Sequence, residues 1–382
     1  MKTTKAWLAT LLLTAVATFA IAPHSFSQEK KVVKIAYVGP LTGPNTAVGI
    51  GTRNSLQLAL DQANAQKVFP FQLQLISETD DSKPSTGADA VKKICDDPGV
   101  IAASAHWNSP VALATSRFFH ECGLMNLISG AASDRLTKQG YKEITRVNTP
   151  FFYIFPILAD KTYTDMNLKN VAVIKSRDDF GNDIAAVFRK RYEELGGKIV
   201  AEEGYNIGER DFTTLLTKVR ALKPEAVMLF GYSTEAALVI RQMRQLGIDA
   251  RFLGASSWQT QTFVDTAGPA AEGSIVATSL PTNEELGAKG AEYLAAYAAG
   301  NFKEPPDVYG PFGYAAGQLL VEAIKKFGPD RKAIADGFRS LRDVDTIFGK
   351  VSVDPDGEVQ PKQVTFAILK NGKFIAFDPS KK

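Results

Sequence analysis

The strongest constraint on the fold is a regular alternation of two kinds of segment along most of the chain. Short apolar runs typical of buried strands alternate with longer segments whose apolar residues have helical spacing. The predicted strands are 32–38, 72–77, 100–104, 124–129, 171–175, 198–202, 226–230, 251–253 and 274–278. The predicted helices lie near 52–66, 85–95, 110–122, 181–195, 211–222, 234–246 and 310–327. Strands that alternate with such helices form parallel sheets covered on both faces, so we predict an α/β fold.

The alternation occurs in two series, which predicts two domains. The segment "RVNTPFFYIFP" (146–156) separates the series and is interpreted as a crossover near 147–150. Further crossovers are predicted near 275–281 and 346–352, before a terminal hairpin at Asn371-Gly372. A chain of 382 residues is also longer than a single hydrophobic core usually supports, which again predicts two domains.

We therefore expect two Rossmann-like parallel-sheet lobes joined by a three-strand hinge. Three connecting strands permit bending but fix the axis, as closure of a cleft requires. The expected lobes are 28–147 plus 280–345, and 150–275 plus 350–382.

The first 27 residues have the pattern of a secretory signal peptide. Lys2 and Lys5 precede the apolar stretch 7–22, and Ser25 and Ser27 are small residues suited to cleavage near Ser27. A membrane anchor is the alternative, but the apolar run is short, contains threonines and lacks a charged flank directly after it. No later stretch is long and apolar enough to span a bilayer, so we expect a periplasmic protein without stable membrane insertion.

The charge balance argues against nucleic acid as a partner. Without the first 27 residues, 42 basic residues stand against 41 acidic ones. A nearly neutral surface has no electrostatic footprint for nucleic acid or for an anionic membrane.

The sequence contains two cysteines, Cys95 and Cys122, and their spacing matches no zinc or redox motif. Either they form one disulfide or both are buried thiols. An oxidising compartment favours the disulfide.

The opening loop, "IAYVGPLTGPNTAVGIG" (35–51), has the strand, glycine loop and helix order of a phosphate-binding site. It fails as a dinucleotide fingerprint because Asn54 stands where the third glycine belongs. No glycine-lysine-serine/threonine sequence follows, which excludes a P-loop. Since ligands of parallel sheets lie at the carboxyl ends of the strands, we interpret this loop as one rim of an interlobe cleft.

Enzyme chemistry has little support in the sequence. Histidine pairs with metal-binding spacing, Cys-x-x-Cys and Gly-x-Ser-x-Gly are absent. A hidden hydrolase pair would consist of His106 and Ser109, whereas a hydrogen-bonded structural histidine is the favoured interpretation. We expect a protein that is not an enzyme and that needs neither cofactor nor metal.

The acidic stretch "SRDDFGND" (176–183) lacks calcium-loop spacing. We interpret Asp178, Asp179 and Asp183 as the acidic first turn of a helix, where they suit the helix dipole. Phe180 is different, because an aromatic residue in a strand-end loop is placed to face the cleft.

The most informative stretch is "SAHWNSPVALATS" (104–116). Ser109 before Pro110 reads as an N-cap followed by proline at the first helical position. The free amides of such a helix end bind a carboxylate without lysine or arginine. Two interpretations stay open for Ser109: a plain helix cap and a carboxylate-binding residue.

Small residues recur in "SGAASDRL" (129–136), where Ser133 is placed to cap or to donate a hydrogen bond. Four aromatic residues have positions suited to the walls of a cleft, although each also suits an ordinary core. They are Trp107, Tyr232, Trp258 and Tyr309.

Taken in order, longer segments resemble one known family. They are 34–65, the loop at Ser109, 123–141, "DDFGND", 208–232, 242–258 and 309–324. Across nearly all of the mature chain, the sequence resembles the periplasmic leucine/isoleucine/valine-binding proteins, the type I periplasmic binding proteins of ABC importers. The resemblance implies a ligand held between two closing lobes.

The resemblance also implies roles for residues of the first lobe. Ser109 matches the serine that holds the ligand carboxylate, and the backbone of Gly130 meets the ligand. Ala132 replaces a threonine that contacts carboxylate and ammonium, with Ser133 beside it as a substitute. Val48 replaces a large aromatic residue that covers the ligand.

In the second lobe the resemblance implies an aromatic wall and one clear departure. Tyr232 matches an aromatic residue of this lobe, and Phe180 replaces a tyrosine. In the first lobe, Tyr309 falls at an aromatic residue of the side-chain pocket. Ser256 stands where the family has the acidic partner of the ligand ammonium. A buried ammonium without a carboxylate is poorly compensated, so only the carboxylate end of the site is kept.

The resemblance implies a monomeric solute-binding protein that captures an amino acid of the branched-chain kind and delivers it to an ABC permease. The alternative is the same role for an amino-free carboxylate or amide ligand. A secreted hydrolase and a ligand-sensing receptor domain are the more remote alternatives.

Overall fold

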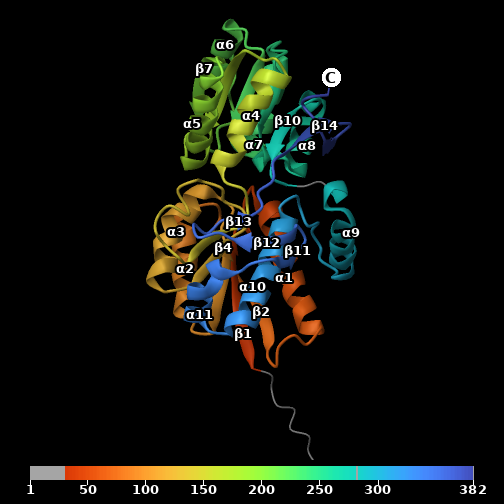
Figure 1. The fold of residues 1–382 in the computed structure, drawn as a ribbon. Coiled ribbons are helices and arrows are strands. Elements are labelled where there is room, and N and C mark those ends of the chain that lie inside the picture. The colour runs from red at the N-terminus through yellow and green to blue at the C-terminus, as the bar shows by residue number, and fades with distance from the viewer. Residues whose placement is uncertain (1–30, 281–282, 382) are drawn as a thin grey trace, which may run out of the picture.

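A computed structural model describes residues 31–280 and 283–381 of the chain. The predicted signal peptide lies outside the described residues. Figure 1 shows two lobes, one above the other, with connecting segments that converge between them. We name them lobe 1, built on a five-stranded sheet, and lobe 2, built on a seven-stranded sheet.

Lobe 1 has the strand order β2-β1-β3-β4-β5, and every pair is parallel. Its strands are β1 (Val32–Gly39), β2 (Gln72–Thr79), β3 (Val100–Ala105), β4 (Met125–Ile128) and β5 (Ile144–Arg146). Its helices are α1 (Thr46–Ala65), α2 (Pro84–Asp96), α3 (Ser109–Glu121), α9 (Asn283–Ala299), α10 (Gly310–Phe327) and α11 (Arg331–Gly337).

Lobe 2 has the strand order β15-β14-β10-β9-β8-β6-β7, in which β14 is antiparallel to both of its neighbours and the other pairs are parallel. Its strands are β6 (Asn170–Ser176), β7 (Lys198–Tyr205), β8 (Ala226–Phe230), β9 (Arg251–Ala255), β10 (Ile275–Thr278), β14 (Thr365–Lys370) and β15 (Lys373–Ala376). Its helices are α4 (Phe151–Asp160), α5 (Asp179–Glu194), α6 (Thr213–Ala221), α7 (Ser233–Gln245) and α8 (Gln261–Ala267).

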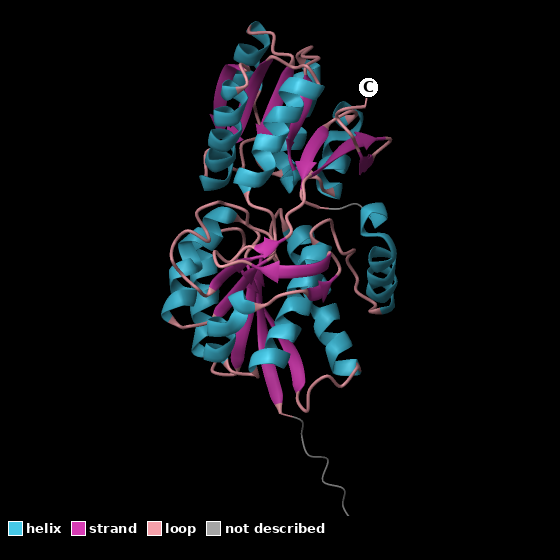
Figure 2. Ribbon diagram, viewed as in Figure 1, coloured by secondary structure: helices cyan, strands magenta, loops and turns pink. Residues whose placement is uncertain are grey.

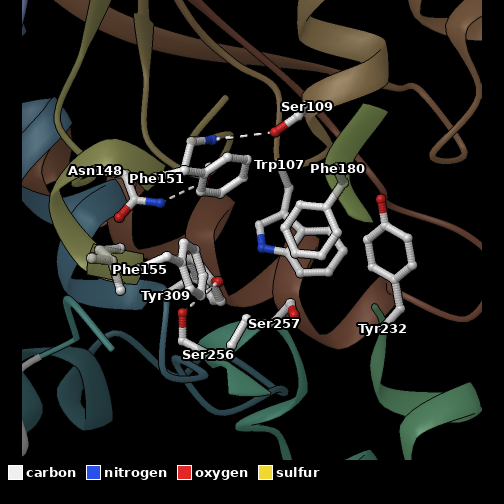
Figure 3. A pocket seen from close by; sticks show the side chains of 14 residues that line it. Trp107, Ser109, Asn148, Phe151, Phe155, Phe180, Tyr232, Ser256, Ser257 and Tyr309 are labelled. Atoms are coloured by element: carbon white, nitrogen blue, oxygen red, sulfur yellow. Dashed lines mark hydrogen bonds between the residues drawn. The ribbon is translucent and has the colours of Figure 1, made fainter. Parts of the chain in front are cut away.

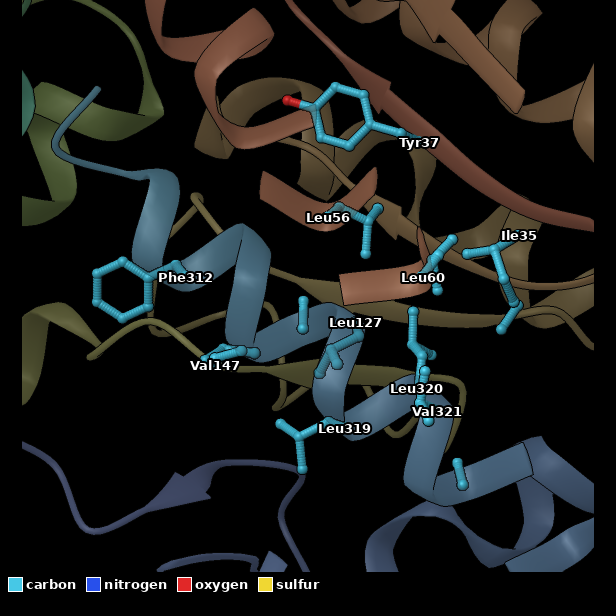
Figure 4. Packing of buried hydrophobic residues seen from close by; sticks show 14 of the residues in the cluster. Ile35, Tyr37, Leu56, Leu60, Leu127, Val147, Phe312, Leu319, Leu320 and Val321 are labelled. Atoms are coloured by element: carbon cyan, nitrogen blue, oxygen red, sulfur yellow. The ribbon is translucent and has the colours of Figure 1, made fainter. Parts of the chain in front are cut away.

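The central strands of both sheets are buried on both faces, as the continuous apolar runs predict (Figure 2). Successive residues of β1 point to opposite faces, so Ile35 and Tyr37 pack under α1 and α10 while Ala36 and Val38 face the α2 and α3 side. Figure 4 shows the first of these layers, with Leu56 of α1 and Leu320 of α10 beside Ile35. The predicted α/β fold is confirmed.

A small antiparallel sheet lies beside lobe 1 and is formed by β11 (Val344–Thr346), β12 (Gly349–Val353) and β13 (Val359–Gln360). Val351 and Val359 pack into the lobe 1 core, and Glu358 forms a parallel bridge with Arg146 of β5. The last passage to lobe 2 therefore lies between Gln360 and Thr365, later in the chain than the predicted 346–352. The apolar pattern of β12 could not distinguish a crossing strand from one packed on lobe 1.

The other two passages lie close to the predicted positions. Residues 147–150 connect β5 to α4, and the second passage follows Thr278, the last residue of β10. The segment interpreted only as a crossover also contains the first turn of α4, because its aromatic residues cover one face of the lobe 2 sheet. The predicted terminal hairpin is present, and Asn371 and Gly372 have the positive φ angles of its turn.

Three buried charges tie two of the connecting segments together. The guanidinium of Arg146 donates to the carboxylate of Glu358, and the ammonium of Lys362 lies 3.0 Å from the same carboxylate. Lys362 Nζ also donates to the Asn148 backbone oxygen at 2.9 Å. Burial lowers the pKa of Lys362 to about 8, although Glu358 opposes this shift.

Cys95 in α2 and Cys122 after α3 form the predicted disulfide, with Cα atoms 5.9 Å apart. The bond joins two helices on the same face of the lobe 1 sheet. In the part of the chain that the structure describes, no helix combines the length and apolar character needed to cross a bilayer.

Candidate ligand-binding site

A small cavity of about 30 Å³ lies between the lobes at the carboxyl ends of the central strands (Figure 3). Lobe 1 contributes the residues that follow β3 and β4, and lobe 2 contributes those that follow β6, β8 and β9. The lining residues are Trp107, Ser109, Gly130, Ala132, Asn148, Phe151, Ile154, Phe155, Phe180, Tyr232, Ala255, Ser256, Ser257 and Tyr309. Eight of the residues expected at the site from the sequence are thus brought together.

Ser109 lines this cavity but does not cap its helix. Asn108 holds the N-cap position of α3, without a side-chain cap bond, and Ser109 is the first helical residue. Ser109 Oγ instead accepts the backbone N–H groups of Ala132 and Ser133, at 3.4 and 3.3 Å. Because those contacts use only its acceptor capacity, the Ser109 hydroxyl proton is free to donate to an anionic oxygen in the cavity.

Gly130 and Ala132 form the narrow part of the wall. A Cβ atom on Gly130 would lie 2.6 Å from the backbone Cα of Trp107, so no larger residue fits without displacement. The Gly130 backbone oxygen accepts the side-chain amide of Asn148 at 2.6 Å, which fixes this loop against the first connecting segment (Figure 3). Small residues at this position leave the backbone open to a ligand.

Aromatic rings from both lobes close the cavity on several sides. Trp107 of lobe 1 lies 5.7 Å from Tyr232 of lobe 2 and 5.8 Å from Tyr309, measured between ring centroids. Phe180 stacks on Tyr232 at 5.0 Å and meets Phe151 edge-on at 5.6 Å. Such a wall suits an aromatic or branched apolar group.

The polar groups of the lobe 2 wall are neutral. Ser256 begins a short 3-10 turn after β9, and its hydroxyl lies 3.5 Å from the Tyr309 hydroxyl, across the interlobe cleft. Burial raises the pKa of Tyr309 to about 12, so this phenol stays protonated at neutral pH. Tyr232 donates its hydroxyl proton to Asp178 at 2.7 Å.

No carboxylate or cation is among the lining side chains. Asp178 lies behind Tyr232, where it also accepts the Ser176 hydroxyl and caps α5 through the Gly181 N–H. Asp178 is the N-cap of α5 and Asp179 lies in its first turn, so the predicted acidic start of this helix is confirmed for these two residues. A ligand ammonium in the cavity would have no opposite charge in direct reach.

Three residues expected at the site lie outside the cavity lining. Trp258 is fully buried in the lobe 2 core, where its indole N–H donates to the Leu229 backbone oxygen at 3.2 Å. Val48 lies on α1 and packs in the lobe 1 core. Sequence position alone could not separate these core roles from a role at the cleft.

Ser133 is the third such residue, and it joins the two lobes. Its hydroxyl donates to Asp183 Oδ2 at 2.6 Å. Arg135 of lobe 1 reaches the same carboxylate at 3.2 Å and Asp179 Oδ1 at 2.6 Å. We name Ser133, Arg135, Asp179 and Asp183 the interlobe latch. The prediction that Asp183 belongs to the acidic first turn of α5 is wrong, because it lies beyond that turn and contacts lobe 1 instead.

Several lining residues were not expected from the sequence. Helix α4 contributes three of them, Phe151, Ile154 and Phe155, although its first residues were predicted to form a crossover. The apolar spacing of "FFYIF" was the signal that could have revealed them. Asn148 and Ser257 carried no comparable signal, because single polar residues in connections are common.

His106 has a structural environment. Its ring Nδ1 lies 2.8 Å from Asp80 Oδ2, and both side chains are fully buried. Ser109 makes no hydrogen bond to this imidazole, so the pair considered for a hydrolase is not assembled. Among the described residues no group of three or more histidine, cysteine or acidic side chains is placed to hold a metal ion.

The fold and this cleft belong to a known class of protein. Residues 32–373 match the periplasmic binding protein family, and the chain belongs to that family. The proteins to which it is similar include leucine/isoleucine/valine-binding proteins.

One such relative is the leucine-, isoleucine-, valine-, threonine- and alanine-binding protein of Pseudomonas aeruginosa. It is 28% identical over 348 residues, which cover 91% of each chain. The crystal structure of a leucine binding protein from Thermotoga maritima is 25% identical, with a TM-score of 0.83 over 91% of this chain and 98% of that one.

A solute binding protein of an ABC transporter from R. palustris, solved in complex with benzoate, has the same fold. Its TM-score is 0.80 at 19% identity, over 90% of this chain and 95% of that one. At this identity the likeness concerns the fold alone.

Proposed function

We propose that the chain is the solute-binding component of an ABC import system, acting as a monomer in the periplasm after removal of its signal peptide. It captures a small carboxylate between its lobes and delivers it to a membrane permease. The family and the two-lobed fold support the transport role. The lobes close about the connections at 147–150, after Thr278 and at 361–364.

One observation carries the ligand class: the cavity offers a free hydroxyl donor and aromatic walls but no carboxylate. Ser109 donates to a ligand carboxylate, and the rings of Trp107, Phe180 and Tyr309 enclose its apolar body. An α-ammonium would be desolvated there without an opposite charge, which costs several kcal/mol. The best-supported ligand is therefore an aromatic or branched aliphatic acid that lacks the α-ammonium.

A neutral branched-chain amino acid is the second candidate. The names of the Pseudomonas aeruginosa relative and the Thermotoga maritima structure favour it. In this case the ammonium would be satisfied by neutral acceptors, such as the Ser256 hydroxyl and backbone oxygens.

A thermal-shift panel of matched pairs separates the two ligand classes. Leucine is compared with 4-methylpentanoate, and phenylalanine with 3-phenylpropanoate, because each pair differs mainly in the ammonium. A ligand at about 100 times its dissociation constant stabilises the folded protein by about 2.7 kcal/mol. We expect the acids to raise the unfolding midpoint and the amino acids to leave it unchanged. If only the amino acids raised the unfolding midpoint, the proposed amino-free ligand would be wrong. If neither class raised it, the proposed carboxylate site would be wrong.

A further inference from the structure

A second and much larger hollow lies between the lobes, on the far side of Tyr232 from the cavity. It has a volume of about 620 Å³, and Tyr232 is the one residue that lines both spaces. We name it the outer groove. Its size is that of a typical small-molecule site.

The deepest part of the groove is lined by hydrogen-bond acceptors that have no positively charged partner among the described residues. Asn108 is only 5% exposed, and its Oδ1 atom has no hydrogen-bond partner. Glu235 of α7 is also 5% exposed; it accepts the Gly208 N–H at 2.8 Å but forms no salt bridge within the described residues. Burial raises the pKa of Glu235, and the nearby Asp178 adds a smaller effect in the same direction.

The buried oxygen of Asn108 is significant because it comes from lobe 1, whereas Glu235 and Asp178 come from lobe 2. An unsatisfied buried acceptor costs about 1–3 kcal/mol. A ligand group with several N–H donors and a positive charge would satisfy all three side chains at once. A primary ammonium has these properties.

The rim of the groove carries charges of both signs, because Asp81 and Glu209 line it together with two cationic side chains. Lys83 of lobe 1 and Arg210 of lobe 2 line it, and in the described parts of the chain neither side chain forms a salt bridge or a hydrogen bond. Between rim and depth the wall is apolar, with Pro44, Pro110 and the ring of Tyr232. Ile207, also in the wall, is 59% exposed.

We propose that the outer groove is a second binding site, for a small zwitterion that places an ammonium against Asn108, Asp178 and Glu235 and a carboxylate against Lys83 and Arg210. An apolar side chain of the ligand lies over Pro110 and Ile207. A short peptide with free termini has this chemistry. Its occupant contacts both lobes and therefore favours the closed arrangement.

The test is a calorimetric titration with three forms of one dipeptide. Leucyl-glycine has both charges, N-acetyl-leucyl-glycine lacks the ammonium, and leucyl-glycinamide lacks the carboxylate. We expect leucyl-glycine to bind, acetylation to weaken binding at least about tenfold, and amidation to weaken it about threefold or more. The proposal would be wrong if the free and acetylated dipeptides bound to the wild-type protein equally, or if leucyl-glycine did not bind at all.

Variants then locate the bound peptide. Glu235→Gln keeps the acceptor for Gly208 and removes the charge, so it should weaken leucyl-glycine binding about tenfold; Arg210→Ala should weaken it about threefold. The matched controls Glu193→Gln and Arg251→Ala change exposed residues away from the groove and should have no effect. Thermal denaturation checks that each variant is folded.

The outcome is separable from that of the proposed function. Binding of leucyl-glycine that is lost in Ser109→Ala but unchanged in Glu235→Gln would place the peptide in the cavity and overturn the second site. Binding that depends on Glu235 and Arg210 supports the second site even where every acid of the matched pairs fails to bind.

Discussion

The Ser133 hydroxyl lies 2.6 Å from Asp183 Oδ2, and this hydrogen bond joins lobe 1 to lobe 2. Arg135 adds charge-assisted contacts to Asp183 and Asp179 on the same side of the cleft. Opening the cleft would break all of these contacts, so they contribute to the closed arrangement rather than to either lobe alone. The affinity of a ligand that requires closure includes this contribution.

Arg135→Ala should weaken ligand binding without lowering the thermal stability of the free protein by a comparable amount. Exposed ion pairs contribute roughly 0.2–1 kcal/mol, so we expect a loss of about two- to fivefold in affinity by calorimetry, reduced at high salt. Arg191→Ala is the matched control, because Arg191 pairs with Asp160 inside lobe 2. An affinity that changes equally in both variants would contradict a role for the latch in closure.

Gly130→Ala tests the close approach of the wall to Trp107. The added Cβ would lie 2.6 Å from the Trp107 Cα atom, so the two loops must separate. We expect roughly 1–3 kcal/mol of destabilisation in urea denaturation and a loss of ligand response. Gly99→Ala is the control, since its Cβ would meet the flexible side chains of Asp97 at 3.1 Å and Lys34 at 3.4 Å rather than backbone. Unchanged ligand affinity in Gly130→Ala would remove this backbone from the site.

Much of the fold could be predicted from the sequence, because strands buried on both faces leave strong apolar runs between amphipathic helices. The position of the last crossing could not, since β12 has the same apolar pattern whether it crosses or packs on lobe 1. The loops after strands were a reliable guide to the cavity, and Ser109, Gly130 and Tyr232 lie where they were expected.

Tertiary packing explains why some residues expected at the site do not line the cavity. Trp258 follows β9 together with the lining residues Ser256 and Ser257, and Val48 lies on α1 after β1, but both side chains pack in the cores. Ser133 is one residue from a lining position and faces the other lobe instead of the ligand. The lining residues from α4 could not be predicted, because their role depends on where that helix lies relative to the cleft in three dimensions.

Asp307 should make stability depend on pH between about 4 and 6. Burial raises the pKa of its carboxyl to about 6, above its ordinary value near 3.8. The folded state therefore retains a proton that the unfolded state releases, and the resulting stability is present below pH 4 and lost as the pH rises through 6.

Asp307→Asn removes this titration and keeps an acceptor for the Tyr309 N–H, and asparagine tolerates the positive φ angle of 56° at this position. Relative to wild type, the variant should gain roughly 1–3 kcal/mol of unfolding free energy between pH 4 and pH 7 in urea denaturation. Asp89→Asn, at an exposed position of α2, is the control. Parallel stability curves for wild type and Asp307→Asn would contradict the raised pKa.

Ser256→Glu should change the ligand class. The substitution places a carboxylate in the cavity wall, where an α-ammonium would compensate it. We expect affinity for leucine to rise relative to 4-methylpentanoate by about tenfold or more. Ser256→Gln has nearly the same volume without the charge and should leave the preference unchanged. A preference that shifts equally in both variants would show that space, rather than charge, sets the ligand class.

The most direct test of the central claim is a calorimetric titration of wild type and Ser109→Ala with the best acid from the matched pairs. We expect one high-affinity site in wild type and a loss of roughly 1–3 kcal/mol of binding free energy in Ser109→Ala, because a charged carboxylate loses a hydrogen bond. The free variant should also unfold at a lower temperature, because the buried amides of Ala132 and Ser133 lose their acceptor, so the titration is done well below that midpoint. Unchanged affinity in Ser109→Ala would contradict the account and leave Ser109 as a structural residue that only accepts the amides of Ala132 and Ser133.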